Sequence, residues 1–71
     1  MNLSTLEDKF NNGDVITVQT LLENRIIRKE LDGVKILAKG DLTKKLTVKA
    51  NLFSENAKAK IESVGGKAEV V

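Results

Sequence analysis

Two short runs of alternating residues, at 34–39 and 46–50, constrain the fold of this chain more than any other feature. Every second residue in them is apolar, namely Val34, Ile36 and Ala38 in the first run and Leu46, Val48 and Ala50 in the second. A period of two is typical of a strand with one buried face. Gly33 and Gly40 bound the first run, as turn residues do. The pattern predicts two short neighbouring strands around a turn, with the apolar residues inward and lysines outward.

Two segments before these runs have the periodicity and end signals of helices. Ser4-Thr5-Leu6-Glu7 has the form of a capping box, which predicts a helix from about Thr5 to Phe10. After a brief extended entry at Val15 and Ile16, Thr17 can cap a second helix that closes near Asn24. The apolar residues of this second helix share one face, and they are Val18, Leu21 and Leu22.

After Ala50 the apolar period changes to that of a helix. The apolar residues recur at spacings of four, four and three, at Phe53, Ala57, Ile61 and Val64. Ser54 is the expected N-cap, Glu55 suits the positive end of the helix, and Gly65-Gly66 supplies a left-handed stop. Residues 67–71 alternate again and predict a last strand, with Ala68 and Val70 on one side. We therefore expect one small mixed α/β domain with short strands and two to three helices.

The composition excludes most catalytic and metal-binding chemistry. The 71 residues include no Cys, His, Trp, Tyr or Pro, so disulfides and zinc sites built from Cys or His are excluded. Glu7 and Asp8 fit the first turn of a helix, Ser4 and Ser54 fit caps, and the glycines form no phosphate loop. We predict a protein that is not an enzyme and needs no cofactor or metal. No apolar run approaches the roughly 20 residues of a membrane span, so we expect a soluble, cytoplasmic protein without membrane contact.

Positive charge is concentrated in the middle of the chain. Residues 25–49 carry eight basic and three acidic side chains, whereas residues 1–24 carry one basic and four acidic ones. The basic side chains of this block are the candidate RNA-binding residues: Arg25, Arg28, Lys29, Lys35, Lys39, Lys44, Lys45 and Lys49. They can form either a solvated polar face or a phosphate-binding stripe. Both phenylalanines, Phe10 and Phe53, have core-like spacing, so we expect contacts with phosphates rather than stacking on bases.

The C-terminal segment offers a second interpretation. A terminal strand at Lys67–Val71 can present an edge to which a partner chain adds a strand. The acidic first third of the chain and the modest net charge of +2 also fit a protein partner. The residues alone therefore leave open a nucleic-acid-binding domain and a protein-interaction module.

The order of residues from Lys35 to Gly65 resembles a known family signature. It begins with a lysine, two aliphatic residues, a small residue, a free position and a glycine, here Lys35, Ile36, Leu37, Ala38, Lys39 and Gly40. Leu42, Leu46 and Val48 follow, and then the pattern F-S-x-x-A-x-x-x-I-x-x-x-G from Phe53 to Gly65. This signature resembles that of the bacterial large-subunit ribosomal proteins numbered fifteen, and the similarity extends over essentially all 71 residues.

The resemblance implies a structural component of the large ribosomal subunit. Such a protein binds large-subunit ribosomal RNA, supports assembly of the subunit beside neighbouring ribosomal proteins, and has no catalytic activity. The family fold is an irregular superhelix of β-β-α turns, and the matched basic positions are Lys35, Lys44, Lys45 and Lys49. Full-length members begin with a glycine-rich basic arm that has no counterpart in this sequence. We therefore expect residues 1–71 to form a single C-terminal globular domain, monomeric when isolated.

Overall fold

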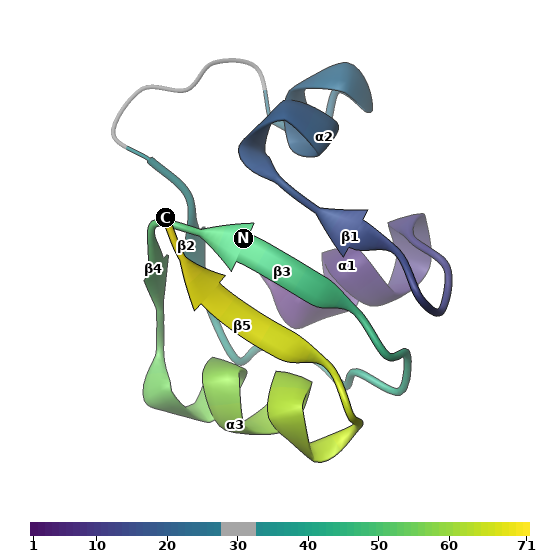
Figure 1. Ribbon diagram of the computed structural model, residues 1–71, viewed down its shortest axis with the longest axis vertical. Helices are drawn as coiled ribbons and strands as arrows, with labels where there is room; N and C mark the ends of the chain where they lie inside the picture. Colours follow the sequence, from purple (N-terminus) through teal and green to yellow (C-terminus); the bar gives the residue numbers. More distant parts are fainter. Residues whose placement is uncertain (28–32) are drawn as a thin grey trace.

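The computed structural model describes residues 1–27 and 33–71, which form three helices and five short strands (Figure 1). In chain order these elements are α1 (Leu3–Lys9), β1 (Val15–Ile16), α2 (Val18–Glu23), β2 (Lys35–Ile36), β3 (Thr47–Ala50), β4 (Leu52–Phe53), α3 (Glu55–Ser63) and β5 (Lys67–Val70). The expected fold class, a small mixed α/β domain with short strands, is confirmed. Within the described residues, no helix combines the length and apolar character that crossing a bilayer requires.

The strands form two small sheets in which every pairing is parallel. One sheet has the order β1-β3-β5, and the other pairs β2 with β4. The prediction that the two alternating runs are neighbours around a turn is therefore wrong, because β2 and β3 belong to different sheets. Each run pairs instead with segments far along the chain: Ile36 lies opposite Phe53, and Val48 lies between Ile16 and Ala68. Figure 1 shows α1 behind the three-stranded sheet and α3 beside β5.

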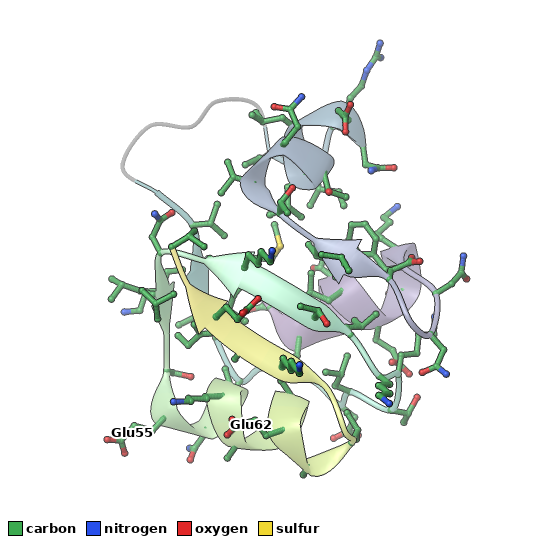
Figure 2. The ribbon with its side chains drawn as sticks, viewed as in Figure 1. Glu55 and Glu62 are labelled. Carbon is green, nitrogen blue, oxygen red and sulfur yellow. The ribbon has the colours of Figure 1, made fainter. Side chains whose placement is uncertain are left out.

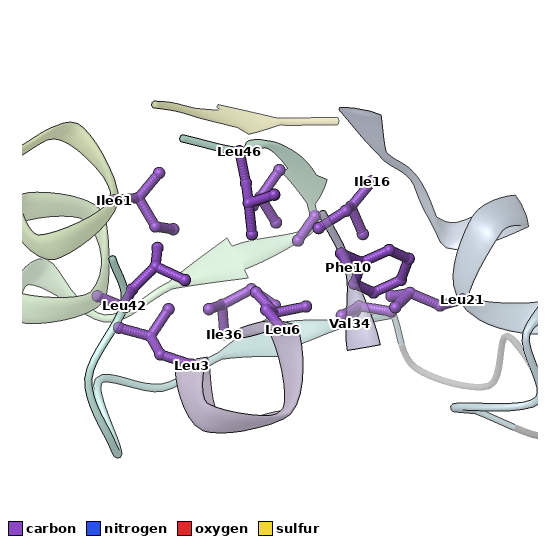
Figure 3. Packing of buried hydrophobic residues seen from close by; sticks show 13 residues of the cluster. Leu3, Leu6, Phe10, Ile16, Leu21, Val34, Ile36, Leu42, Leu46 and Ile61 are labelled. Atoms are coloured by element: carbon purple, nitrogen blue, oxygen red, sulfur yellow. The ribbon is translucent and has the colours of Figure 1, made fainter. Parts of the chain in front are cut away.

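The core takes its side chains from every helix and from both alternating runs. It contains thirteen buried apolar residues, from Leu3 and Leu6 of α1 to Ala57 and Ile61 of α3, which converge in Figure 3. The inward alternation is confirmed, since five of the six inward residues are buried and Ala38 packs against the core. No polar or charged residue of the described segments is buried. Burial of apolar area is therefore the main stabilising term of this domain.

The first helix begins two residues earlier than predicted. Asn2 is the N-cap and makes no side-chain capping bond, so the proposed capping box of Ser4 and Glu7 is wrong. The amides of the first turn bind neighbouring main chain instead: the Leu3 amide donates to the Leu37 carbonyl at 3.2 Å, and the Ser4 amide donates to the Lys39 carbonyl at 3.1 Å. Tertiary contacts thus satisfy the donors that a capping box satisfies in an isolated helix.

The other predicted helix ends are confirmed. The Thr17 hydroxyl accepts from the Thr20 amide at 3.1 Å, and the Ser54 hydroxyl accepts from the Ala57 amide at 3.2 Å. Asn24 is the C-cap of α2. Gly65 follows α3 with a φ of +87°, the left-handed conformation that glycine adopts without steric cost. In β5, Ala68 packs against the core, whereas Val70 beyond it remains 71% exposed.

Candidate nucleic-acid interface

Three of the predicted basic residues have side chains that are exposed and without partners among the described residues. They are Lys35 on β2, Lys39 just after it, and Lys45 just before β3. The main-chain groups of all three are tied to the fold, because the Lys35 and Lys39 carbonyls accept hydrogen bonds from Met1 and Ser4, and the Lys45 amide donates to Asn12. The main chain that carries these three lysines is therefore fixed, while their ammonium groups remain available to an external anion.

Lys44 lies in the same loop but is committed to the fold. Its ammonium donates to the main-chain carbonyl of Glu7, in the last turn of α1, and to that of Phe10, the C-cap of this helix. A cation at this end of a helix also interacts favourably with the helix dipole. The Lys44 side chain is half-buried, in contrast to that of Lys45. The contacts of Lys44 are structural ones, although the sequence pattern places it with the binding candidates.

Lys49 is also paired within the domain. Its ammonium lies 3.9 Å from the Glu69 carboxylate across the β3–β5 ladder, and the two side chains are 40% and 50% exposed. An exposed pair at this distance contributes about 0–1 kcal/mol. Lys49 can therefore exchange this partner for a stronger anion at little cost.

The remaining candidates lie around the 28–32 segment. Arg25 follows the C-cap of α2, is exposed, and has a φ of +57°. Arg28 and Lys29 lie outside the described residues. The structure therefore gives positions for six of the eight predicted basic residues.

Lys60 of α3 is a basic residue that the sequence analysis did not select. Its ammonium donates to the Gly40 carbonyl at 3.3 Å, which places it beside the loop that contains Lys39. The helical period that buries Ile61 places Lys60 next to it, at the border of the core. The charge balance of residues 50–71 is neutral, and Glu55 and Glu62 lie on the same helix (Figure 2). Only the tertiary contact brings Lys60 to the basic loop.

The basic residues that the structure describes form no single stripe along two adjacent strands. The 39–45 loop instead approaches α3 at both ends: Gly40 accepts from Lys60, and the Lys45 stem runs alongside Gly65. We call Lys39, Lys45 and Lys60 the loop surface. Lys35 and Lys49 belong to the two different sheets. The arrangement presents several separated ammonium groups, which suits an extended, repeating anion better than one small ligand.

Residues 1–27 and 33–71 contain no group of acidic residues able to hold a metal ion and form no pocket. The pKa of the Glu7 carboxylate is lowered, mainly by the hydrogen bond from the Thr43 hydroxyl and next by the one from the Thr43 amide. Its role is to hold the loop, because its partners are all loop donors.

Comparison with known proteins identifies the family. Residues 1–69 match the family described as ribosomal proteins 50S-L15 and 50S-L18e together with their 60S counterpart. The large ribosomal subunit protein uL15 of Kosmotoga olearia is 63% identical to the chain over 71 residues, and that of Fervidobacterium nodosum is 61% identical. Both alignments cover 100% of this chain and 48% of the relative, so the chain spans about half the length of these curated relatives. The chain belongs to the ribosomal protein family that contains 50S-L15, 50S-L18e and their 60S counterpart.

Proposed function

We propose that this chain is a structural component of the large ribosomal subunit that binds ribosomal RNA through phosphate contacts. The family match supports the ribosomal role, and the relatives are named large ribosomal subunit proteins. The observation that carries the RNA contact is the set of exposed ammonium groups on rigidly anchored main chain, at Lys35, Lys39 and Lys45. Phosphate contacts of this kind position a protein on RNA with little base readout.

The basic residues have different parts in this proposal. Lys35, Lys39, Lys45 and Arg25 contact phosphates directly, together with Arg28 and Lys29 of the predicted set. Lys49 joins them when it leaves Glu69, since that exposed pair is weak. Lys44 orients the loop that carries its neighbour Lys45. Binding of this type needs no cofactor and no catalysis, and it fits a role in assembling the subunit in the cytoplasm.

Titration of a large-subunit ribosomal RNA fragment at several salt concentrations tests this proposal. Each phosphate contact contributes roughly −0.7 to −0.9 to the slope of log K against log salt. The triple variant Lys35→Ala/Lys39→Ala/Lys45→Ala should bind more weakly and lower the magnitude of that slope by about 2–3. The matched control is Lys9→Ala/Lys58→Ala/Lys67→Ala, which removes the same charge at other exposed lysines.

The two triple variants distinguish contacts at specific lysines from attraction by net charge alone. A larger loss of RNA affinity in the first triple variant than in the control supports the specific contacts. Equal losses of affinity would show that only net charge matters, and would contradict the assignment of these three lysines. Absence of salt-sensitive binding by the folded wild-type chain would contradict RNA binding by residues 1–71.

A second candidate function, an interaction module for neighbouring ribosomal proteins, is favoured by the position of β5. This strand is at the edge of its sheet, and Val70 and Val71 at its end are 71% and 64% exposed. Deleting Val70 and Val71 should abolish binding of such a partner without reducing RNA binding. Partner binding that survives this deletion would exclude the strand edge as the site.

A further inference from the structure

The turn between α1 and β1 contains an asparagine that is followed by glycine, Asn12-Gly13. The main-chain nitrogen of the residue after an asparagine can attack the asparagine side chain, because the two groups close a five-membered ring. A side chain on that next residue hinders the approach, and glycine has none. The other asparagines are all followed by larger residues, and they are Asn2, Asn11, Asn24, Asn51 and Asn56. The local sequence therefore favours this reaction at Asn12 above the other asparagines.

The turn leaves both reacting groups open to solvent. Asn12 and Gly13 are exposed, and no atom lies within 4 Å of the place where a Cβ of Gly13 would be. Water and hydroxide therefore reach the turn freely. Any protection of Asn12 has to come from hydrogen bonds rather than from burial.

The main chain of Lys45 binds both reacting groups. The Lys45 amide donates to the side-chain oxygen of Asn12 at 2.5 Å, and the Lys45 carbonyl accepts from the Gly13 amide at 2.7 Å. These bonds continue the parallel pairing of β1 with β3, in which the Thr47 amide donates to the Asp14 carbonyl at 3.0 Å. The Gly13 proton is thereby protected from hydroxide, as in slowed hydrogen exchange, and the Asn12 side chain is held toward Lys45.

We propose that Asn12 is a deamidation site, and that its pairing with the Lys45 main chain restricts the reaction to moments when this turn is open. In the open turn hydroxide removes the Gly13 amide proton, and the nitrogen forms a bond to Cγ of Asn12. The bond from Cγ to Nδ2 breaks, and this nitrogen takes a proton from water, leaves as ammonia and regenerates hydroxide. Water then opens the succinimide ring at either carbonyl, which gives aspartate or isoaspartate. The net reaction is hydrolysis of one amide, with no oxidation or reduction.

The two products have different consequences for the loop that contains Lys45. Both add a negative charge beside this loop. Aspartate keeps a side-chain oxygen that can accept from the Lys45 amide. Isoaspartate adds a methylene to the main chain before Gly13, so that the Gly13 amide no longer meets the Lys45 carbonyl in the same register. This chemistry does not depend on RNA binding, because it uses only the turn and the Lys45 main chain.

Incubation at mildly alkaline pH, followed by peptide mass spectrometry, tests the site and its protection. The folded chain is compared with the same chain in guanidinium chloride. The exchange of an amide for an acid should occur first at Asn12, and it should be at least about tenfold slower in the folded chain. Equal rates in the two states would overturn the protection. Faster reaction at another asparagine of the unfolded chain would overturn the assignment of the site.

The variant Lys44→Met tests whether opening of the loop controls the rate. It removes the bonds from the ammonium to the Glu7 and Phe10 carbonyls, and leaves Asn12 and Gly13 unchanged. Because it loosens the residue next to Lys45, both deamidation at Asn12 and hydrogen exchange of the Gly13 amide should become about fivefold faster in the folded variant.

Lys58→Met is the matched control, since Lys58 is exposed on α3. It should leave both rates unchanged, and amide spectra establish that each variant is folded. In denaturant the wild type and both variants should react at the same rate, because the sequence around Asn12 is the same in all three. If folded Lys44→Met reacts no faster than Lys58→Met, or if the wild-type Gly13 amide exchanges as fast as in the unfolded chain, the proposal is overturned.

Discussion

Lys44 and Glu7 are joined by two hydrogen bonds, and Lys44 is the donor in both. The Lys44 ammonium donates to the Glu7 carbonyl, and the Glu7 carboxylate accepts from the Lys44 amide at 3.2 Å. The same carboxylate accepts from the amide and the hydroxyl of Thr43, and the same ammonium donates to the Phe10 carbonyl. This arrangement fastens the end of α1 to the 43–45 loop, so a stability element lies directly beside an exposed candidate for RNA binding.

Replacing Lys44 should therefore destabilise the domain. Lys44→Met keeps most of the apolar stem but removes the charge-assisted bonds to two helix-end carbonyls, and should lower the free energy of unfolding by about 1–2 kcal/mol. Urea denaturation measures the change. The matched control is Lys45→Met, because the Lys45 ammonium has no partner among the described residues. It should change stability by less than about 0.5 kcal/mol. Equal effects of the two variants would contradict the structural assignment of Lys44.

The Glu7 contacts predict a pH dependence with a defined sign. The pKa of Glu7 is lowered in the folded chain, chiefly by the hydrogen bond from the Thr43 hydroxyl, because that bond favours the charged form. Its stabilising contribution is therefore fully present above the pKa of the unfolded chain and is lost as pH falls through the lower, folded pKa. The difference in stability between wild type and Glu7→Gln should be largest near neutral pH and shrink on acidification.

Denaturation curves at several pH values check this expectation, with Glu62→Gln as the control at an exposed acid of α3. The control should show a smaller difference from wild type near neutral pH. A Glu7→Gln difference that stays constant, or grows, as pH falls would show that the carboxylate is not the stabilising acceptor.

The buried face of α3 should be sensitive to truncation at Ile61. Ile61 is fully buried and its loss leaves a cavity, so Ile61→Ala should cost roughly 2–5 kcal/mol. The total free energy of unfolding of small domains is about 5–15 kcal/mol, so the variant should melt at a much lower temperature or be unfolded. Leu52→Ala removes an apolar side chain that is 59% exposed, and should change stability little. A cooperative melt of Ile61→Ala at the wild-type temperature would show that the helix face is misplaced.

The two consecutive glycines after α3 include one position that should not tolerate a side chain. A Cβ at Gly66 would lie 2.3 Å from the Leu46 carbonyl oxygen and 3.0 Å from that of Ile61. Both contacts are with main chain, which cannot move aside cheaply, so Gly66→Ala should cost about 3 kcal/mol or more. Gly13→Ala meets no atom within 4 Å but has a φ of +94°, so it should cost about 1–2 kcal/mol. Chemical denaturation of both variants tests the ranking, and a smaller loss at Gly66 would contradict the close approach.

Much of the local structure could be predicted from the sequence, because the interactions that produce it lie within a few residues of one another. The hydroxyls of Thr17 and Ser54 cap amides three residues on, and Gly65 ends α3 by its own conformational freedom. The alternation at 34–38 and 46–50 identified the buried faces correctly, since a strand places alternate side chains on opposite sides. The family signature likewise depends on residue order alone.

The pairing of the strands was decided by the tertiary structure. Val15–Ile16 and Lys67–Val70 lie on either side of β3 in the sheet, although both are far from it along the chain. Main-chain hydrogen bonds carry no sequence information of their own, so two alternating runs with a turn between them predict a hairpin as readily as separate parallel ladders. The common core selects the parallel arrangement, because the connections through α2 and α3 bury their apolar side chains in it.

The candidate site shows the same division. The sequence by itself determined that the centre of the chain is basic and that no Cys or His chemistry is possible. Only the tertiary structure separated Lys44, which caps the carbonyls of α1, from Lys45, which remains exposed, and only it brought Lys60 to Gly40. The physical reason is that the charge of a side chain depends only on its residue type. The group that binds this charge depends on which distant main-chain groups the packed core brings close to it.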